Sequence, residues 1–361
     1  MSTDTGTQTA DLVECDLADP AGEALYRQAH ADVEVPSQRL LLGDRHGSRT
    51  ADEDLAFIRG TSADRFRVGT LLDGGRAVGW WGVRLPLLDN LSTALVWTAV
   101  TPDARRRGHG TRMLAHAERL ARDAGRTVLQ SWQMLPIDDG TPDPTSAFAA
   151  RHGYASALPS LRNDLDLVDG PDGADGPPDL GRALGVLDAE VGLLRDRLAH
   201  DYRLVTFWDQ VPDEHLVDRA HLMQRMSTDA PTGDLTTEEE RWDGERVREH
   251  EQIARAQGRD VVETCALHVP SGRLVAFTQL SVPTRDPRTV YQWDTLVLRE
   301  HRGLRLGMWI KAANLRHAVA RYPQVRRLTT FNAASNAPML RVNRAMGFRA
   351  VCRETCFEKR L

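Results

Sequence analysis

Two short turns rich in glycine and arginine have the composition of an anion-binding site. They are Arg105–Gly110 and Arg302–Gly307, and each follows an apolar run and precedes residues at helical spacing. Small residues let the backbone approach a ligand, and the N–H groups of a first helical turn present the positive end of the helix dipole. Arginine adds charge and hydrogen-bond donors. The pattern predicts a phosphate-bearing ligand, although a strand-to-helix turn without a ligand has the same composition.

Neither turn matches the common nucleotide-binding motifs. No Gly-Lys-Ser/Thr follows in either turn, which excludes the usual magnesium-nucleotide site of a P-loop. A dinucleotide fold would place Gly-x-Gly-x-x-Gly near the start of its domain, with an acidic residue after the next strand. Neither turn offers that arrangement.

The elements that must position the two turns occur twice in the same order. Each copy is expected to contain a strand, the turn, a helix, a second strand and a short helix that ends at a Gly-aromatic pair. In the first copy these are 95–100, 105–110, 113–124, 127–132 and Gly153-Tyr154, and in the second 292–297, 302–307, 308–319, 327–331 and Gly347-Phe348. A further strand is expected over 350–357. Because the same series of elements occurs twice, the sequence predicts a duplicated domain rather than two similar glycine turns that arose by chance.

A segment of glycine, proline and aspartate separates the two copies. Residues 168–181 have almost nothing to bury, which is typical of a linker. We expect a flexible tail at 1–10, a first domain at 11–167, the linker at 168–181 and a second domain at 182–361.

Composition limits the class of protein. The 361 residues include 46 Lys and Arg against 51 Asp and Glu, and this net charge of −5 gives no reason to expect a nucleic-acid partner. No run approaches the ~20 apolar residues of a membrane span, and the polar N-terminus resembles no signal or transit peptide. The four cysteines are scattered, without partners at zinc spacing. We expect a cytoplasmic monomer or homodimer without metal, membrane or nucleic acid.

The two turns resemble the acyl-CoA-binding motif of the GNAT superfamily of N-acetyltransferases, which reads Arg/Gln-x-x-Gly-x-Gly/Ala after a strand ending in valine. Arg105–Gly110 matches this motif in full, whereas Arg305 takes the place of the first glycine in the second turn. There, His301–Gly307 is similar to a branch that carries His-Arg-Gly-x-x-Leu-Gly. The resemblance covers most of both copies. It implies an α/β fold with a mixed sheet, used as two tandem GNAT domains in an architecture like that of mycothiol-synthase-type members.

The resemblance also implies acetyl-CoA, or another acyl-CoA, as cofactor. Its pyrophosphate would lie on the amides of the turns and its pantetheine along the strands that end at Val100 and Val297. A neutral amine would attack the thioester directly, without a covalent enzyme intermediate. We expect the second turn to work through its backbone amides despite Arg305. The cofactor-binding candidates are Leu296, Val297, Leu298, Arg302, Gly303, Leu304, Arg305, Leu306, Gly307, Asn332 and Asn336 in the second copy, and Val100, Arg105, Arg106, Arg107, Gly108, His109, Gly110 and Thr111 in the first.

Asparagine is scarce, and its distribution favours the second copy as the catalytic one. Four of the six asparagines lie between 314 and 343. An amide side chain has a donor and an acceptor, which suits the amides of pantetheine, and we expect such contacts from Asn332 and Asn343. Asn336 either joins them or caps the helix entered through Pro338. The first domain has no asparagine in its equivalent segment and is expected to be mainly a scaffold.

The sequence indicates the general acid and the general base less clearly. Many family members place a tyrosine four residues before the Gly-Phe pair as the acid for the leaving thiolate. The corresponding residues are Ala149 and Asn343. Asn343 is a catalytic-site candidate by position, but neither residue can be that acid, so no proton donor is assigned. Asp294 and then Tyr291 are candidate general bases on the strand that leads to Val297. Asp294 is equally compatible with a solvated or salt-bridged strand residue.

An acidic stretch could bind the amine. Residues 228–245 contain seven acids and one arginine, and Asp229, Asp234 and Trp242 are the candidate substrate contacts. The acids would attract a cation and the indole would stack on it. A solvated helix N-terminus would have the same charges.

Taken together, these features predict an acetyl-CoA-dependent N-acetyltransferase that acts on the primary amine of a small molecule. The second domain would be catalytic. The alternative is a non-catalytic acyl-CoA sensor or interaction module, which the missing tyrosine favours. The asparagines and the acidic stretch favour the enzyme.

Overall fold

The computed structural model describes residues 10–47, 49–137, 143–167 and 191–361. Contacts divide these residues into two units. Unit 1 contains 10–136, 143–157 and 356–361, and unit 2 contains 158–167, 191–355 and Ile137. The expected linker and nearly all of the expected tail lie outside the described residues.

Unit 1 is a mixed sheet with helices on both faces. Its strands lie in the order β1-β2-β3-β4-β5, followed by the end of β12. Strands β1 to β4 are antiparallel to their neighbours, whereas β4 and β5 are parallel. The strands are β1 Asp11–Glu14, β2 Asp64–Asp73, β3 Arg76–Pro86, β4 Thr93–Val100, β5 Val128–Leu135 and β12 Arg349–Arg360, and the helices are α1 Pro20–Ala29, α2 Val35–Leu42, α3 Ala51–Gly60, α4 His109–Asp123 and α5 Pro144–Arg151.

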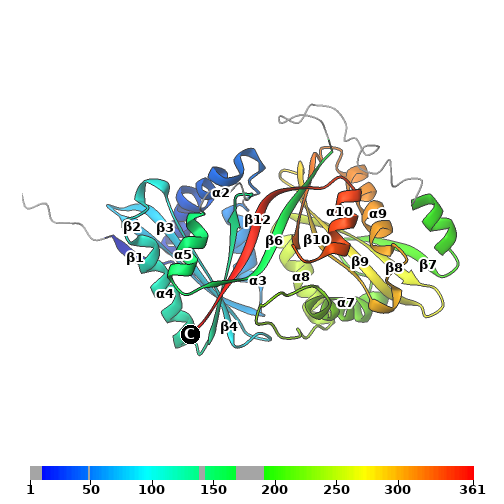
Figure 1. Ribbon diagram of the computed structural model, residues 1–361, viewed down its shortest axis with the longest axis horizontal. Helices are drawn as coiled ribbons and strands as arrows, with labels where there is room; N and C mark the ends of the chain where they lie inside the picture. Colours follow the sequence, from blue (N-terminus) through cyan, green and yellow to red (C-terminus); the bar gives the residue numbers. More distant parts are fainter. Residues whose placement is uncertain (1–9, 48, 138–142, 168–190) are drawn as a thin grey trace, which may run out of the picture. The chain divides into compact units, whose positions relative to one another are not determined.

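Unit 2 repeats this plan (Figure 1). Its strands lie in the order β6-β11-β10-β9-β8-β7, with the start of β12 beside β6. Strands β10 and β11 are parallel, and the other pairs from β11 to β7 are antiparallel. The strands are β6 Ala155–Asp166, β7 Tyr202–Trp208, β8 Arg259–His268, β9 Arg273–Pro283, β10 Thr289–Val297 and β11 Arg327–Ala333, and the helices are α7 Leu216–Asp229, α8 Gly244–Ala256, α9 Leu306–Arg321 and α10 Ala337–Ala345.

Two strands belong partly to each unit. Residues 158–166 of β6 lie in unit 2, where they pair with β11. Residues 356–360 of β12 lie in unit 1, where the Lys359 ammonium binds Glu118 of α4 at 2.8 Å. The expected domain ranges of 11–167 and 182–361 do not include this exchange. A boundary at the linker places all of β6 in the first domain and all of β12 in the second.

The two faces of the unit 2 sheet bury separate apolar clusters. One cluster joins α9 to side chains such as Val262, Ala276 and Leu280. The other joins Leu222 of α7 to Phe277, among others. Since side chains alternate along a strand, Phe277, Gln279 and Ser281 point to the α7 face of β9. This assignment fixes which side chains share a face near the two turns.

The elements expected on both sides of each turn are confirmed. Strands 95–100 and 292–297 are within β4 and β10, and the helices after the turns are α4 and α9. The later strands are β5 and β11, the short helices before the Gly-aromatic pairs are α5 and α10, and 350–357 lies within β12.

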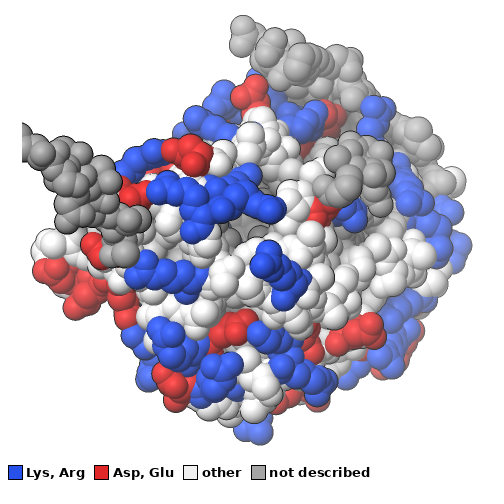
Figure 2. Space-filling view, turned by 60° about the vertical axis from the view of Figure 1, so that its left-hand side comes forward, with Lys and Arg blue, Asp and Glu red and all other residues white. Residues whose placement is uncertain are grey.

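Within the described ranges, no helix is both long and apolar enough to cross a membrane. No group of three or more His, Cys, Asp or Glu side chains in those ranges is placed to hold a metal ion. All four cysteines are buried. On the face shown in Figure 2, basic and acidic side chains are interspersed, with basic ones gathered towards the centre of the view.

Candidate active site

In each unit the two parallel strands separate before the turn. Strand β4 pairs with β5 only over Thr93–Leu95, although it continues to Val100. Strand β10 pairs with β11 only over Thr289–Tyr291, although it continues to Val297. Beyond these residues the facing edges do not pair with each other, so their backbone groups can hydrogen-bond to a ligand placed between the strands.

The two turns have the same backbone form. Arg106 and Gly303 both adopt positive φ, at 63° and 83°, and so do Gly108 and Arg305, at 83° and 62°. Arg305 therefore takes the left-handed conformation of the glycine that it replaces, and the turn keeps its form. No described side chain caps α4 or α9, so the first N–H groups of both helices are available to an anion.

The leading arginine of each turn is held in the same way. Arg105 Nε donates to the Val100 carbonyl at 3.1 Å, and Arg302 Nε donates to the Val297 carbonyl at 2.9 Å. Each guanidinium therefore ties its turn to the end of the preceding strand. Its remaining N–H groups are the ones that could reach a phosphate.

Asp229 lies beside the second turn. Its side chain, only 1% exposed, accepts from Arg302 Nη2 at 2.8 Å and pairs with Arg299 at 3.2 Å and with Arg225. These contacts fix the Arg302 guanidinium. The carboxylate is already engaged with three arginines, so the position of Asp229 suits the cofactor turn rather than the amine.

The expected asparagines come together on the α9 face of unit 2. Asn343 of α10 donates from Nδ2 to Asn332 Oδ1 of β11 at 2.7 Å. Asn343 is buried, and its Oδ1 has no hydrogen-bond partner in the part of the chain that the structure describes. A buried orphan acceptor beside the separated strands fits an amide N–H of pantetheine. Asn336 caps α10, accepting from the Met339 N–H at 3.3 Å.

Strand β10 has a β-bulge that β4 lacks. Its register with β9 shifts between Gln292 and Thr295, whereas β3 and β4 pair without interruption. The Gln292 amide fills the bulge and donates to the Gln279 carbonyl at 2.7 Å and the Trp293 carbonyl at 3.2 Å. A bulge frees backbone groups from the ladder and redirects the side chains of its strand. In unit 2 the bulge lies at the point where β10 separates from β11.

Asp294 lies within this bulge. It is half-buried, and no described residue pairs with its carboxylate. Burial raises the pKa of Asp294; the charge of Arg219 opposes the rise, and Glu240 and Glu263 add to it. A carboxyl group with a raised pKa is a better proton acceptor at neutral pH than an ordinary aspartate.

The other catalytic and substrate candidates of unit 2 each have contacts of their own. The Tyr291 ring lies under the Arg259 guanidinium at 5.0 Å. Trp242 donates to Glu240 at 2.9 Å and packs against His250 and Arg246 of α8. Asp234 is exposed. Asp229 is bound by arginines, Trp242 packs against α8 and Asp234 is exposed, so the three substrate candidates have different surroundings.

Three polar residues near Asp294 were not predicted as site residues from the sequence. Arg219 and Glu263 are 3% and 2% exposed and form an ion pair at 2.6 Å, and Gln279 lies opposite the bulge. The one feature of the sequence that could have indicated them is Glu263, a single acid within the otherwise uncharged residues 261–267.

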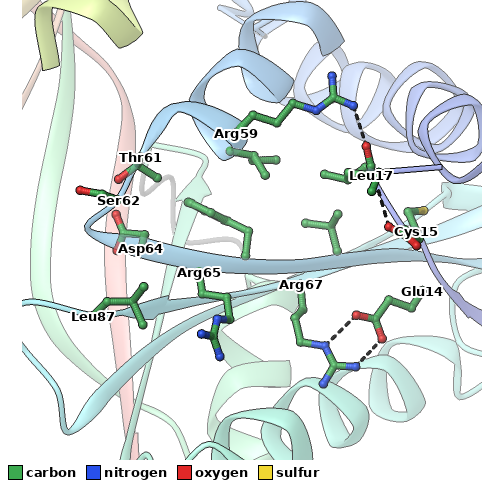
Figure 3. A pocket seen from close by; sticks show the side chains of 15 residues that line it. Glu14, Cys15, Leu17, Arg59, Thr61, Ser62, Asp64, Arg65, Arg67 and Leu87 are labelled. Atoms are coloured by element: carbon green, nitrogen blue, oxygen red, sulfur yellow. Dashed lines mark hydrogen bonds and ion pairs between the residues drawn. The ribbon is translucent and has the colours of Figure 1, made fainter. Parts of the chain in front are cut away.

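A cavity of about 960 Å³ lies elsewhere, in unit 1 (Figure 3). It is lined by 14–18, by part of 58–68 and by Leu87. Its arginines are mostly engaged: Arg67 binds Glu14 at 2.7 Å, and Arg59 donates to the Leu17 carbonyl at 2.7 Å. None of the expected site residues lines it.

Comparison with known proteins agrees with the duplicated plan. Residues 36–138 match the acetyltransferase (GNAT) family model. The whole chain is similar to a solved structure described as a tandem GNAT protein from the clavulanic acid biosynthesis pathway, without AcCoA. The identity is 29%, the alignment covers 97% of this chain and 98% of the other, and the TM-score is 0.72. The chain has the tandem GNAT fold.

Two more distant structures share the GNAT fold. A GCN5-related N-acetyltransferase from Sphaerobacter thermophilus is 17% identical over 97% of this chain and 95% of its own, with a TM-score of 0.60. A glucosamine N-acetyltransferase region of a fungal multi-domain GH3 β-N-acetylglucosaminidase is 14% identical over 98% of this chain and 38% of that protein, with a TM-score of 0.63. No curated protein matches the sequence. GNAT proteins use acyl-CoA, so the fold implies an acyltransferase in general.

Proposed function

We propose that unit 2 transfers an acetyl group from acetyl-CoA to the primary amine of a small molecule by direct attack. The observation that carries this proposal is the bulge in β10, with Asp294 inside it, at the point where β10 separates from β11. Unit 1 has the separated strands and the turn but no bulge in β4.

The residues of unit 2 fit an acyl-CoA. The uncapped N-terminus of α9 and the turn 302–307 would hold the phosphates, and Arg302 adds a guanidinium fixed by Asp229. The orphan Oδ1 of Asn343 and the edge of β10 would accept and donate hydrogen bonds along pantetheine. When bound, the cofactor supplies an acyl group activated as a thioester.

The bulge and Asp294 would assist the attack. Backbone N–H groups freed from the ladder between Gln292 and Thr295 can donate to a developing oxyanion. An amine is mostly protonated at neutral pH and must lose a proton before it attacks, and Asp294 would accept that proton. The general acid remains unassigned, since Asn343 has no acidic proton.

Unit 1 would serve mainly as a scaffold. Trp97 occupies the position that corresponds to Asp294, and its ring lies against Gly82, where a β-carbon would come within 2.0 Å of it. The ring of Phe148 lies 3.4 Å from the β-carbon position of Gly110, at the start of α4. The Trp97 ring fills space that unit 2 leaves to polar groups.

A matched pair of substitutions tests the assignment. Thiol release from acetyl-CoA would be measured with a panel of primary amines for Gly307→Asp and Gly110→Asp, which place an acid at equivalent points of the two turns. We expect turnover to be abolished by Gly307→Asp and retained with Gly110→Asp, because the added carboxylate repels phosphate only at the catalytic turn. Loss of turnover with Gly110→Asp alone would reverse the assignment. Tight CoA binding with no amine turnover in the unmodified protein would favour the sensor.

A further inference from the structure

Three polar side chains form a row across the α7 face of the unit 2 sheet. Glu263 of β8 lies directly opposite Gln279 of β9. Gln279 in turn faces the bulge of β10, since its neighbours Thr278 and Leu280 pair with Thr295 and Gln292. The row therefore runs from Glu263 through Gln279 to Asp294, and it ends at the proposed site of acyl transfer.

Arg219 of α7 covers the Glu263 end of this row. Its guanidinium lies 4.0 Å from the centre of the Phe277 ring, and its Nε donates to Glu263 Oε1 at 2.6 Å. Cys265 Sγ donates to the same oxygen at 3.3 Å. Glu263 Oε2 and Arg219 Nη1 are both buried without a hydrogen-bond partner among the described residues. A purely structural ion pair at this burial would be expected to satisfy both groups.

Unit 1 has no such row. The residues that correspond in register are Val68, Gly82 and Trp97, with Val68 opposite Gly82 and Gly82 opposite Trp97. The Trp97 ring lies directly over Gly82. The same place in the fold is thus closed by apolar groups in unit 1 and lined by carboxylates, an amide and a guanidinium in unit 2.

We propose that Glu263, Gln279, Asp294 and Arg219 form the acceptor site, and that it takes a primary amine bearing a hydroxyl group on a short aliphatic spacer. This inference rests on the proposed function and names its substrate class. The ammonium binds at Asp294, next to the transferred acyl group. The hydroxyl donates to Glu263 Oε2 and accepts from Arg219 Nη1, so one group satisfies both orphan atoms.

The width of the row sets the length of the spacer. Adjacent strands lie about 4.8 Å apart, so the backbones of Glu263 and Asp294, two strands apart, are separated by roughly 10 Å, and side chains that leave the same face by about as much. A hydrogen bond of about 3 Å at each end leaves roughly 4 Å between the nitrogen and the oxygen of the ligand. Two or three carbons span that distance. A carboxylate in place of the hydroxyl would be repelled by Glu263 and Asp294.

Matched amines test this inference. The kcat/KM for acetyl transfer would be compared for 3-aminopropan-1-ol and n-butylamine, which differ by a hydroxyl in place of a methyl group, with β-alanine as the carboxylate analogue. We expect at least about a tenfold preference for the amino alcohol, the effect of a hydrogen bond to a buried charge. Glu263→Gln should remove most of this preference, because the hydroxyl loses its acceptor. Glu214→Gln, at an exposed position before α7, should leave it unchanged.

The outcomes separate this inference from the proposed function. Equal or better turnover of n-butylamine or β-alanine would overturn the inference and leave the acetyltransferase standing. Absence of turnover with every amine would overturn the proposed function, and this inference with it. If Glu263→Gln does not fold, Gln279→Met is the second test. It removes the amide that lies between Glu263 and the bulge, so it should lower the kcat/KM for the amino alcohol more than the kcat/KM for n-butylamine. An unchanged preference in the folded variants would also contradict the site.

Discussion

Replacing Lys311 should stabilise the protein. Lys311 is one of only two lysines in the chain and lies on α9 at the position of Leu114 on α4. It is 2% exposed, and its Nζ lies 5.6 Å from the centre of the Phe348 ring, a cation–π contact without an ion-pair partner among the described residues. Burial lowers the pKa of Lys311 from 10.5 to about 7.

The magnitude of the effect follows from this difference. One pKa unit corresponds to about 1.4 kcal/mol, so a protonated Lys311 destabilises unit 2 by at most about 5 kcal/mol. Between pH 7 and 10.5 the unfolded chain holds a proton that the folded chain lacks, so the stability of the unmodified protein rises with pH across this window. Below pH 7 both states are protonated and the difference is constant. Methionine at 311 fills a similar volume without charge and should remove this dependence.

Urea unfolding of the full chain, followed by tryptophan fluorescence, would measure the effect at pH 7 and at pH 9. We expect Lys311→Met to be more stable than the unmodified protein at pH 7, with the advantage shrinking by about 1.4 kcal/mol per pH unit as pH rises. Lys359→Met is the control, because Lys359 is paired with Glu118 and should give no such pH-dependent gain. If Lys311→Met is less stable at pH 7, or if its advantage is the same at both pH values, burial of Lys311 does not destabilise the fold in this way.

Two substitutions near the bulge bear on the chemistry. Asp294→Asn should lower kcat/KM by about 10²–10⁴-fold and abolish the fall in rate at acidic pH, because burial raises the pKa of the base that must be deprotonated. The control is Asp196→Asn at an exposed position. An unchanged pH–rate profile for Asp294→Asn would exclude Asp294 as the base. Gln292→Val, which installs the residue that unit 1 has at Val96, should lower kcat about a hundredfold with little change in the KM for acetyl-CoA, because the bulge loses the amide that fills it. Steady-state kinetics would measure this, and an unchanged kcat would show that the bulge takes no part in the chemistry.

Much of the fold could be predicted because the duplication repeats its local signals. Apolar runs, helical spacing and glycine turns at one constant offset located the strands and helices around both turns. Arg305 was expected to leave the turn functional, and its positive φ explains how a non-glycine residue keeps the form of Gly108. The exchange of β6 and β12 could not be predicted, because strands pair with partners that are far away in sequence. A linker shows where one copy ends and the next begins, but not which strands pair.

The acceptor site was harder to find for a physical reason. Asp229 stood in an acidic stretch and suggested an amine site, yet its carboxylate binds Arg302 and Arg299. Glu263 and Arg219 come from elements far apart in sequence and meet only through sheet register and the packing of α7. The bulge adds a single residue to β10, a change too small to notice without the pairing to β9.

A crystal structure of the full chain with CoA would show which of the two turns binds the cofactor and where its sulfur lies. We expect CoA in unit 2, with its phosphates on the turn 302–307 and its sulfur between β10 and β11 beside the bulge. CoA bound only at the turn 105–110 of unit 1, with the space between β10 and β11 empty, would contradict this expectation.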